Sequence, residues 1–137
     1  MTADNPFRGG LGETSREILD NFQGFLKDIF PKQETEAHLC VERLAAWGAT
    51  VRQAEKYNFE VLFKGGVSLR VEPFNHKGVK TSISIVAGGN ITTLFVKPGE
   101  WNLMSNKDTI HLESSLSEIF FRRESDGIVN AHTYLAT

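Results

Sequence analysis

The hydrophobic residues near the start of the chain repeat with the spacing of one helical face. They are Ile18, Leu19, Phe22, Phe25, Leu26 and Ile29. This spacing predicts an amphipathic helix whose polar residues lie on the opposite side. Thr14 and Glu17 have the spacing of a capping box, in which two side chains satisfy free backbone amides at the helix start. Pro31 predicts the end of the helix, because proline disfavours a helical conformation of the preceding residue.

A second helical pattern extends from about Thr35 to Lys56. Its stripe consists of small and medium residues: Ala37, Val41, Leu44, Ala45, Gly48, Val51 and Ala54. Trp47 lies off this stripe, beside Cys40 on a helical wheel, so the apolar surface covers more than half of the helix circumference. Because the connection between the two helices is short, we predict a helical hairpin over residues 14–57.

From Asn58 onward the hydrophobic period changes from helical to alternating. Alternation predicts β-strands, and the glycine pairs between them predict tight hairpin turns. The predicted strands cover residues 59–64, 67–72, 79–87 and 91–97. The sequence therefore predicts four consecutive antiparallel strands.

The last part of the chain supports two interpretations. Residues 115–118 have capping-box spacing, which favours a helix over residues 118–125. Asp126-Gly127 is instead typical of a hairpin turn between two strands. The consecutive apolar residues at 119–121 favour the hairpin, and a further short strand is expected around residues 110–112.

These patterns predict an α+β fold, in which an N-terminal helical hairpin packs on an antiparallel sheet of five to six strands in two layers. We expect one domain over residues 13–137, with the helical hairpin at 14–57 and the sheet at 58–137. Residues 1–12 contain three glycines and one proline, which predicts a flexible arm with Phe7 as its single aromatic residue.

The composition fits one folded domain. The chain has 137 residues, with 15 Lys and Arg against 17 Asp and Glu, and a net charge of −2. Ten Phe, two Trp and two Tyr argue against a disordered chain, which has too few large apolar groups to offset its ordering entropy. The balanced charge argues against a dedicated nucleic-acid binder and against a polybasic membrane anchor.

The sequence also suggests a compartment. The first twelve residues carry Asp4 and contain no apolar core of a secretory signal, and no run approaches the roughly 20 apolar residues that span a bilayer. The single cysteine, Cys40, cannot form an intramolecular disulfide and fits a reducing environment. We expect a cytoplasmic protein without membrane contact, in which Cys40 is a small buried hydrophobe.

Most catalytic motifs are missing from the sequence. The glycine pairs are followed by strand patterns rather than by the helix that a phosphate-binding loop requires, and no histidines are paired at helical spacing. We therefore expect no cofactor and no metal. The best catalytic candidates are His111 and Glu113, on the same strand face, together with His132 from the last strand. An alternative function is therefore a small-molecule pocket or a small enzyme that uses these three residues.

A second alternative is nucleic-acid binding by the sheet. Arg70, Lys80, Arg122 and Arg123 would project from it, with Phe120 available to stack on bases. Interleaved glutamates would oppose phosphate: Glu60, Glu72, Glu118 and Glu124. We therefore do not expect nucleic acid as a partner.

The favoured prediction is a non-catalytic protein-binding or assembly module that associates with itself. Residues 81–96 are rich in β-branched side chains and nearly free of charge, so at a sheet edge they would recruit another strand. Large aromatic residues in the arm, the second helix and a loop are candidate contact residues, as are two arginines. These candidates are Phe7, Trp47, Trp101, Arg122 and Arg123.

Overall fold

The computed structural model describes residues 15–73 and 81–135. Among them, two helices are followed by nine strands. The helices are α1 (Arg16–Ile29) and α2 (Glu34–Ala46). The strands are β1 (Thr50–Glu55), β2 (Asn58–Leu62), β3 (Ser68–Pro73), β4 (Thr81–Ala87), β5 (Asn90–Val96), β6 (Asn102–Ser105), β7 (Thr109–Glu113), β8 (Ser117–Arg123) and β9 (Val129–Leu135).

Helix α1 forms where its apolar spacing predicts it. Its N-cap is Ser15, whose hydroxyl accepts a hydrogen bond from the Ile18 amide at 3.1 Å, whereas Thr14 lies outside the described residues. The helix ends at Ile29, two residues before the proline that predicts its end. Phe22 on its buried face packs against Phe59 of β2, with ring centroids 5.0 Å apart. Full burial of such a side chain stabilises the fold by about 1.5 to 3 kcal/mol.

The second predicted helix is wrong over its last ten residues, 47–56. Helix α2 ends at Ala46, and the chain then forms β1 rather than continuing to Lys56. The reversal occurs at Gly48, whose φ of 74° lies in the left-handed region that favours glycine. Pairing of β1 with β2 supplies backbone hydrogen bonds and buries Val51, so tertiary pairing overrides the helical spacing.

Five antiparallel strands form one sheet in the order β1-β2-β3-β4-β5. The predicted strands at 59–64, 67–72, 79–87 and 91–97 correspond to β2 through β5, with slightly different ends. The β4–β5 hairpin turns at Gly88 and Gly89, whose φ values are 57° and 83°. Two positive φ values in a two-residue loop are typical of the type I′ turn that the glycine pair predicts.

The remaining strands form a separate four-stranded antiparallel sheet in the order β6-β7-β8-β9. Residues 117–123 form strand β8, so the hairpin interpretation of this region is confirmed over the helix. The preceding residues 114–116 form part of the β7–β8 turn, in which the Ser114 hydroxyl accepts hydrogen bonds from the amides of Leu116 and Ser117. Strand β6 was not predicted, because its four residues are too few to show a period.

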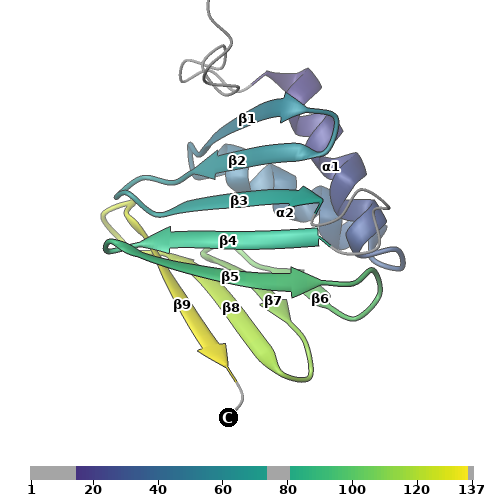
Figure 1. The fold of residues 1–137 in the computed structure, drawn as a ribbon. Coiled ribbons are helices and arrows are strands. Elements are labelled where there is room, and N and C mark those ends of the chain that lie inside the picture. Colours follow the sequence, from purple (N-terminus) through teal and green to yellow (C-terminus); the bar gives the residue numbers. More distant parts are fainter. Residues whose placement is uncertain (1–14, 74–80, 136–137) are drawn as a thin grey trace, which may run out of the picture.

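The α+β class is confirmed, but the strands form two sheets instead of one sheet of five to six. Figure 1 shows the helices and β6 to β9 on the same side of the five-stranded sheet. The two sheets meet where Phe63, just after β2, stacks on Phe121 of β8 with centroids 5.0 Å apart. The Val129 amide also donates a hydrogen bond to the Lys64 carbonyl at 2.9 Å. One hydrophobic core therefore joins both helices and both sheets.

Candidate functional site

Strand β5 is an edge of the five-stranded sheet. Within the described strands it pairs with β4 alone, and none of its seven residues carries a charge. Its alternation turns Leu94 and Val96 toward the core and leaves Ile91 and Phe95 on the outer face, 70% and 49% exposed. Of the region 81–96 that the sequence marked as a liability at a sheet edge, β5 thus lies at an edge, whereas β4 pairs on both sides.

A hollow of about 380 Å³ borders the second half of β5. Phe95 lines it from the strand, and Leu116, which is 69% exposed, lines it from the β7–β8 turn. The hollow is also lined by Leu94, Glu100, Trp101, Ser114, Ser115 and Ser117. Trp101 is only 6% exposed, so the indole predicted as a contact residue forms part of the wall rather than a projection.

One row of residues crosses the outer face of the four-stranded sheet. The strand register sets Met104, His111, Phe120 and His132 side by side on β6, β7, β8 and β9. The rings of His111 and Phe120 are nearly parallel, 10° apart, with centroids separated by 4.0 Å. Tyr134 meets the same Phe120 ring edge-on at 5.9 Å. Two protein rings therefore already contact Phe120, which leaves less of its ring available to stack on a base.

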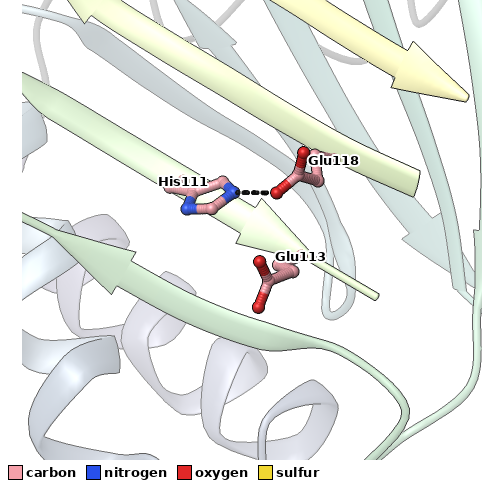
Figure 2. Close-up of side chains that lie close together, drawn as sticks. All are labelled: His111, Glu113 and Glu118. Atoms are coloured by element: carbon pink, nitrogen blue, oxygen red, sulfur yellow. Dashed lines mark ion pairs between the residues drawn. The ribbon is translucent and has the colours of Figure 1, made fainter. Parts of the chain in front are cut away.

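His111 lies in a cluster with two glutamates (Figure 2). One donor atom from each of His111, Glu113 and Glu118 can be chosen so that all three lie within 4.8 Å of one another. His111 Nε2 and Glu118 Oε1 are 3.4 Å apart. All three residues are half-buried, and the Glu118 side chain is the more exposed of the ion pair, at 39% against 16% for His111.

The predicted trio of His111, Glu113 and His132 is only partly assembled. The first two share a strand face as expected, but Phe120 separates His111 from His132. Two strand spacings amount to about 10 Å, which is too far for a shared proton or ligand. Glu118 takes the third place in the cluster.

The sequence prediction missed Glu118 as a member of the cluster because it did not specify how residues 117–123 pair with residues 109–113. Glu118 is directly opposite Glu113 across the β7–β8 turn. The capping-box spacing of residues 115–118 pointed instead to a helix, where these two carboxylates would not be opposed. A hairpin centred on residues 115–116 is the signal that would have found it.

The other predicted contact residues have different surroundings. Trp47 is 3% exposed, and its indole N–H donates a hydrogen bond to the Lys107 carbonyl at 2.9 Å. Arg123 lies over the Trp47 ring at 5.9 Å and donates two hydrogen bonds to Asp108 Oδ1, whereas Arg122 is exposed. Phe7 and the rest of the predicted arm lie outside the described residues.

The outer face of the five-stranded sheet carries a ladder of paired charges. Arg52 and Arg70 both approach the carboxylate of Glu60, at 3.8 and 3.6 Å. The other members of the predicted basic surface are Lys80, outside the described residues, and the arginine pair on β8, of which one is bound to Asp108. This pairing reduces the positive charge available to phosphate.

The centre of the core contains an apolar cavity of about 30 Å³. Side chains from both helices and both sheets line it, including Leu44, Leu69 and Leu103. Ligand pockets usually measure about 300 to 1,000 Å³, so this cavity is far below that size. Cys40 also lines it, and burial, together with the nearby Glu36 carboxylate, raises the pKa of its thiol to about 12.

Comparisons of this chain with protein-family models, with curated proteins and with solved structures find no match. In the part of the chain that the structure describes, neither helix has the length and apolar character needed to cross a membrane.

Proposed function

We propose that the protein is a non-catalytic assembly module that associates with a second copy of itself through the edge of β5. The observation that supports this most directly is an uncharged edge strand with two large apolar side chains on its exposed face. Protein edges are usually protected by charge, proline or a bulge, because unpaired backbone groups recruit other strands. Strand β5 has none of these protections.

The hairpin geometry indicates which backbone groups face the edge. Ala87 and Asn90 close the two-residue turn and, in a hairpin of this kind, exchange both backbone hydrogen bonds. Hydrogen bonding to the neighbour strand alternates along β5, so Thr92 and Leu94 also point toward β4. The amides and carbonyls of Ile91 and Thr93 then point away from β4, toward an added strand.

The pattern of β5 is complementary to itself. If two copies pair antiparallel about Thr93, Ile91 of one copy lies opposite Phe95 of the other, and the two Thr93 residues face each other. Pairs of an aromatic with a β-branched residue and pairs of threonines both stabilise adjacent strands. No charge is opposed in this register, which favours a second copy over a charged partner.

Such pairing forms a symmetric dimer, because each copy offers the same surface to the other. The two five-stranded sheets become one continuous sheet across the interface. The hollow beside β5, with Phe95 and Leu116 on its walls, adds apolar surface next to the paired edge. The predicted contact residue Trp101 contributes to this surface as a wall of the hollow.

The proposal is tested by sedimentation equilibrium of the full chain and of the variant Ile91→Lys. The wild type is expected to be a dimer that dissociates on dilution. Lysine removes two cross-strand pairs per dimer, each worth up to about 1 kcal/mol, and adds charge at the edge, so we expect association to weaken tenfold or more.

The matched control for Ile91→Lys is Asn130→Lys. Asn130 is also exposed and also lies on an edge strand, β9 of the other sheet, so it adds the same charge away from β5. This control is expected to dimerise like the wild type. A strictly monomeric wild type, or equal loss of association in both variants, would contradict the proposal.

We also propose a cytoplasmic location. The sequence contains one cysteine, and that residue is a buried free thiol. A fold without disulfide support that keeps a thiol in its core suits a reducing compartment.

A further inference from the structure

The cluster of His111, Glu113 and Glu118 combines one imidazole nitrogen with two carboxylates on rigid, paired strands. Glu113 and Glu118 form a direct cross-strand pair, and His111 precedes Glu113 by two residues on the same face. The register of one hairpin therefore fixes all three donors relative to one another. Figure 2 shows the imidazole directed at the Glu118 carboxylate, with Glu113 beside both.

Two like charges directly opposite each other destabilise a strand pair. Glu113 and Glu118 are such a pair, and Glu113 makes no ion pair with any of the described residues. The repulsion between these carboxylates would be offset by a cation between them. His111 lies within 4.8 Å of both carboxylates, and it is charged only when protonated.

The His111 ring is held in one orientation. It stacks on Phe120 and is 16% exposed, and its Nε2 atom is shielded from solvent. Among the described residues Nε2 makes no hydrogen bond, although it lies 3.4 Å from Glu118 Oε1. A shielded imidazole nitrogen without a hydrogen bond is costly, and a metal ion is a partner that would satisfy it.

From these observations we propose that His111 Nε2 and the carboxylates of Glu113 and Glu118 bind one divalent transition-metal ion of the Zn²⁺ class. Nitrogen and carboxylate donors at about 2.1 Å from a tetrahedral ion lie about 3.4 Å apart, which is the distance already present between His111 and Glu118. A donor oxygen of Glu113 lies within 4.8 Å of the other two donors, so Glu113 would reach the same ion after adjustment of its flexible side chain. Three protein donors leave a further coordination position open to water or to another ligand.

Isothermal titration of the metal-free full chain with ZnCl₂ tests the site. The wild type is expected to bind one ion per chain. The nearly isosteric variants Glu113→Gln and Glu118→Gln each replace an anionic donor with a weak neutral one, so we expect affinity to fall tenfold or more in each. His111→Gln removes the nitrogen donor and is expected to lose binding to a similar extent.

His132→Gln is the matched control, because His132 is an exposed histidine on the same sheet and Phe120 separates it from the cluster. This variant is expected to bind Zn²⁺ like the wild type. The proposal is overturned if the wild type binds no Zn²⁺ below 100-fold excess, if the glutamine variants keep wild-type affinity, or if His132→Gln loses as much as His111→Gln.

Thermal unfolding gives a second readout that keeps the test valid even if His111→Gln folds poorly. Without metal, Glu113→Gln removes like-charge repulsion and is expected to unfold at a higher temperature than the wild type. Zn²⁺ is expected to raise the unfolding temperature of the wild type more than that of Glu113→Gln, because the wild type binds the ion more tightly. A variant with the same Zn²⁺-induced shift as the wild type would refute the site.

The Zn²⁺ test is independent of the test of self-association. Ile91→Lys is expected to keep wild-type Zn²⁺ binding, so failure of one proposal would leave the other standing.

Discussion

At the scale of single residues, Trp47 shows how a partner far along the chain can satisfy a large buried side chain. Trp47 and Trp101 were predicted as contact residues because they lie off the main apolar stripe and in a loop. Both are buried in the structure. The polar end of Trp47 is satisfied by the Lys107 carbonyl, from a segment 60 residues away. Such distant partners leave no local pattern in the sequence, so the hydrogen bond of the Trp47 indole could not be predicted.

The buried thiol of Cys40 leads to a prediction about reactivity. Its pKa, raised to about 12 by burial and by Glu36, leaves almost no thiolate at pH 8, so alkylation by iodoacetamide is expected to be very slow in the folded protein. Unfolding in guanidinium should restore the rate of an ordinary thiol. Mass spectrometry of the alkylated fraction over time provides the measurement, and rapid labelling of the folded protein would contradict the burial.

The same shift makes stability depend on pH in a defined window. The thiol has a pKa near 9.0 in the unfolded chain and about 12 in the folded one, so the unfolded chain loses its proton first. Its contribution to the free energy of unfolding is fully present below pH 9 and declines toward pH 12, by about 1.4 kcal/mol per pH unit. Cys40→Ala should show a shallower decline than the wild type over this range.

At the scale of elements, the boundary between α2 and β1 was the largest error of the sequence prediction. The apolar spacing of residues 35–56 fits one long helix, yet the chain reverses at Gly48. A glycine inside a helical pattern can be a packing residue or a helix end, and sequence alone does not separate the two. The outcome depends on pairing of β1 with β2, which is a contact between elements.

Two glycine substitutions test this boundary with opposite expected signs. Gly48→Ala places a Cβ in the left-handed region, at 3.3 Å from Lys64 Cε, and should lower the free energy of unfolding by about 1 to 2 kcal/mol. Gly24→Ala, in the exposed middle of α1 with no atom within 4 Å of the new Cβ, should raise it by about 0.5 to 1 kcal/mol. Urea denaturation measures both, and equal effects would contradict the helix end at Gly48.

At the scale of the whole molecule, the sequence specified the α+β class and most of the hairpins, because alternation and glycine turns are local signals. It did not specify that the strands divide into two sheets. That division depends on long-range contacts such as the stacking of Phe63 on Phe121. The candidate site could likewise be predicted only in part. His111 and Glu113 are two residues apart on one strand, so their shared face follows from the sequence, whereas Glu118 joins them only through the pairing of β7 with β8.

The absence of charge in β5 matters because this strand lies at a sheet edge. In the middle of a sheet the same residues would need no explanation, but at the edge they leave the backbone groups of Ile91 and Thr93 facing away from β4. Pairing with a second copy would convert these groups into a continuous ladder. Self-association through β5 therefore predicts that the backbone amides of Ile91 and Thr93 form hydrogen bonds with a second copy.

Hydrogen exchange followed by NMR measures these amides directly. If β5 pairs with a second copy about Thr93, the exchange of the Ile91 and Thr93 amides will slow as the protein concentration rises, and in Ile91→Lys the slowing of Thr93 will require at least tenfold higher concentration. The amides of Thr92 and Leu94, which bond to β4, will be protected at every concentration. Equal and rapid exchange of Ile91 and Thr93 at all concentrations would contradict the account.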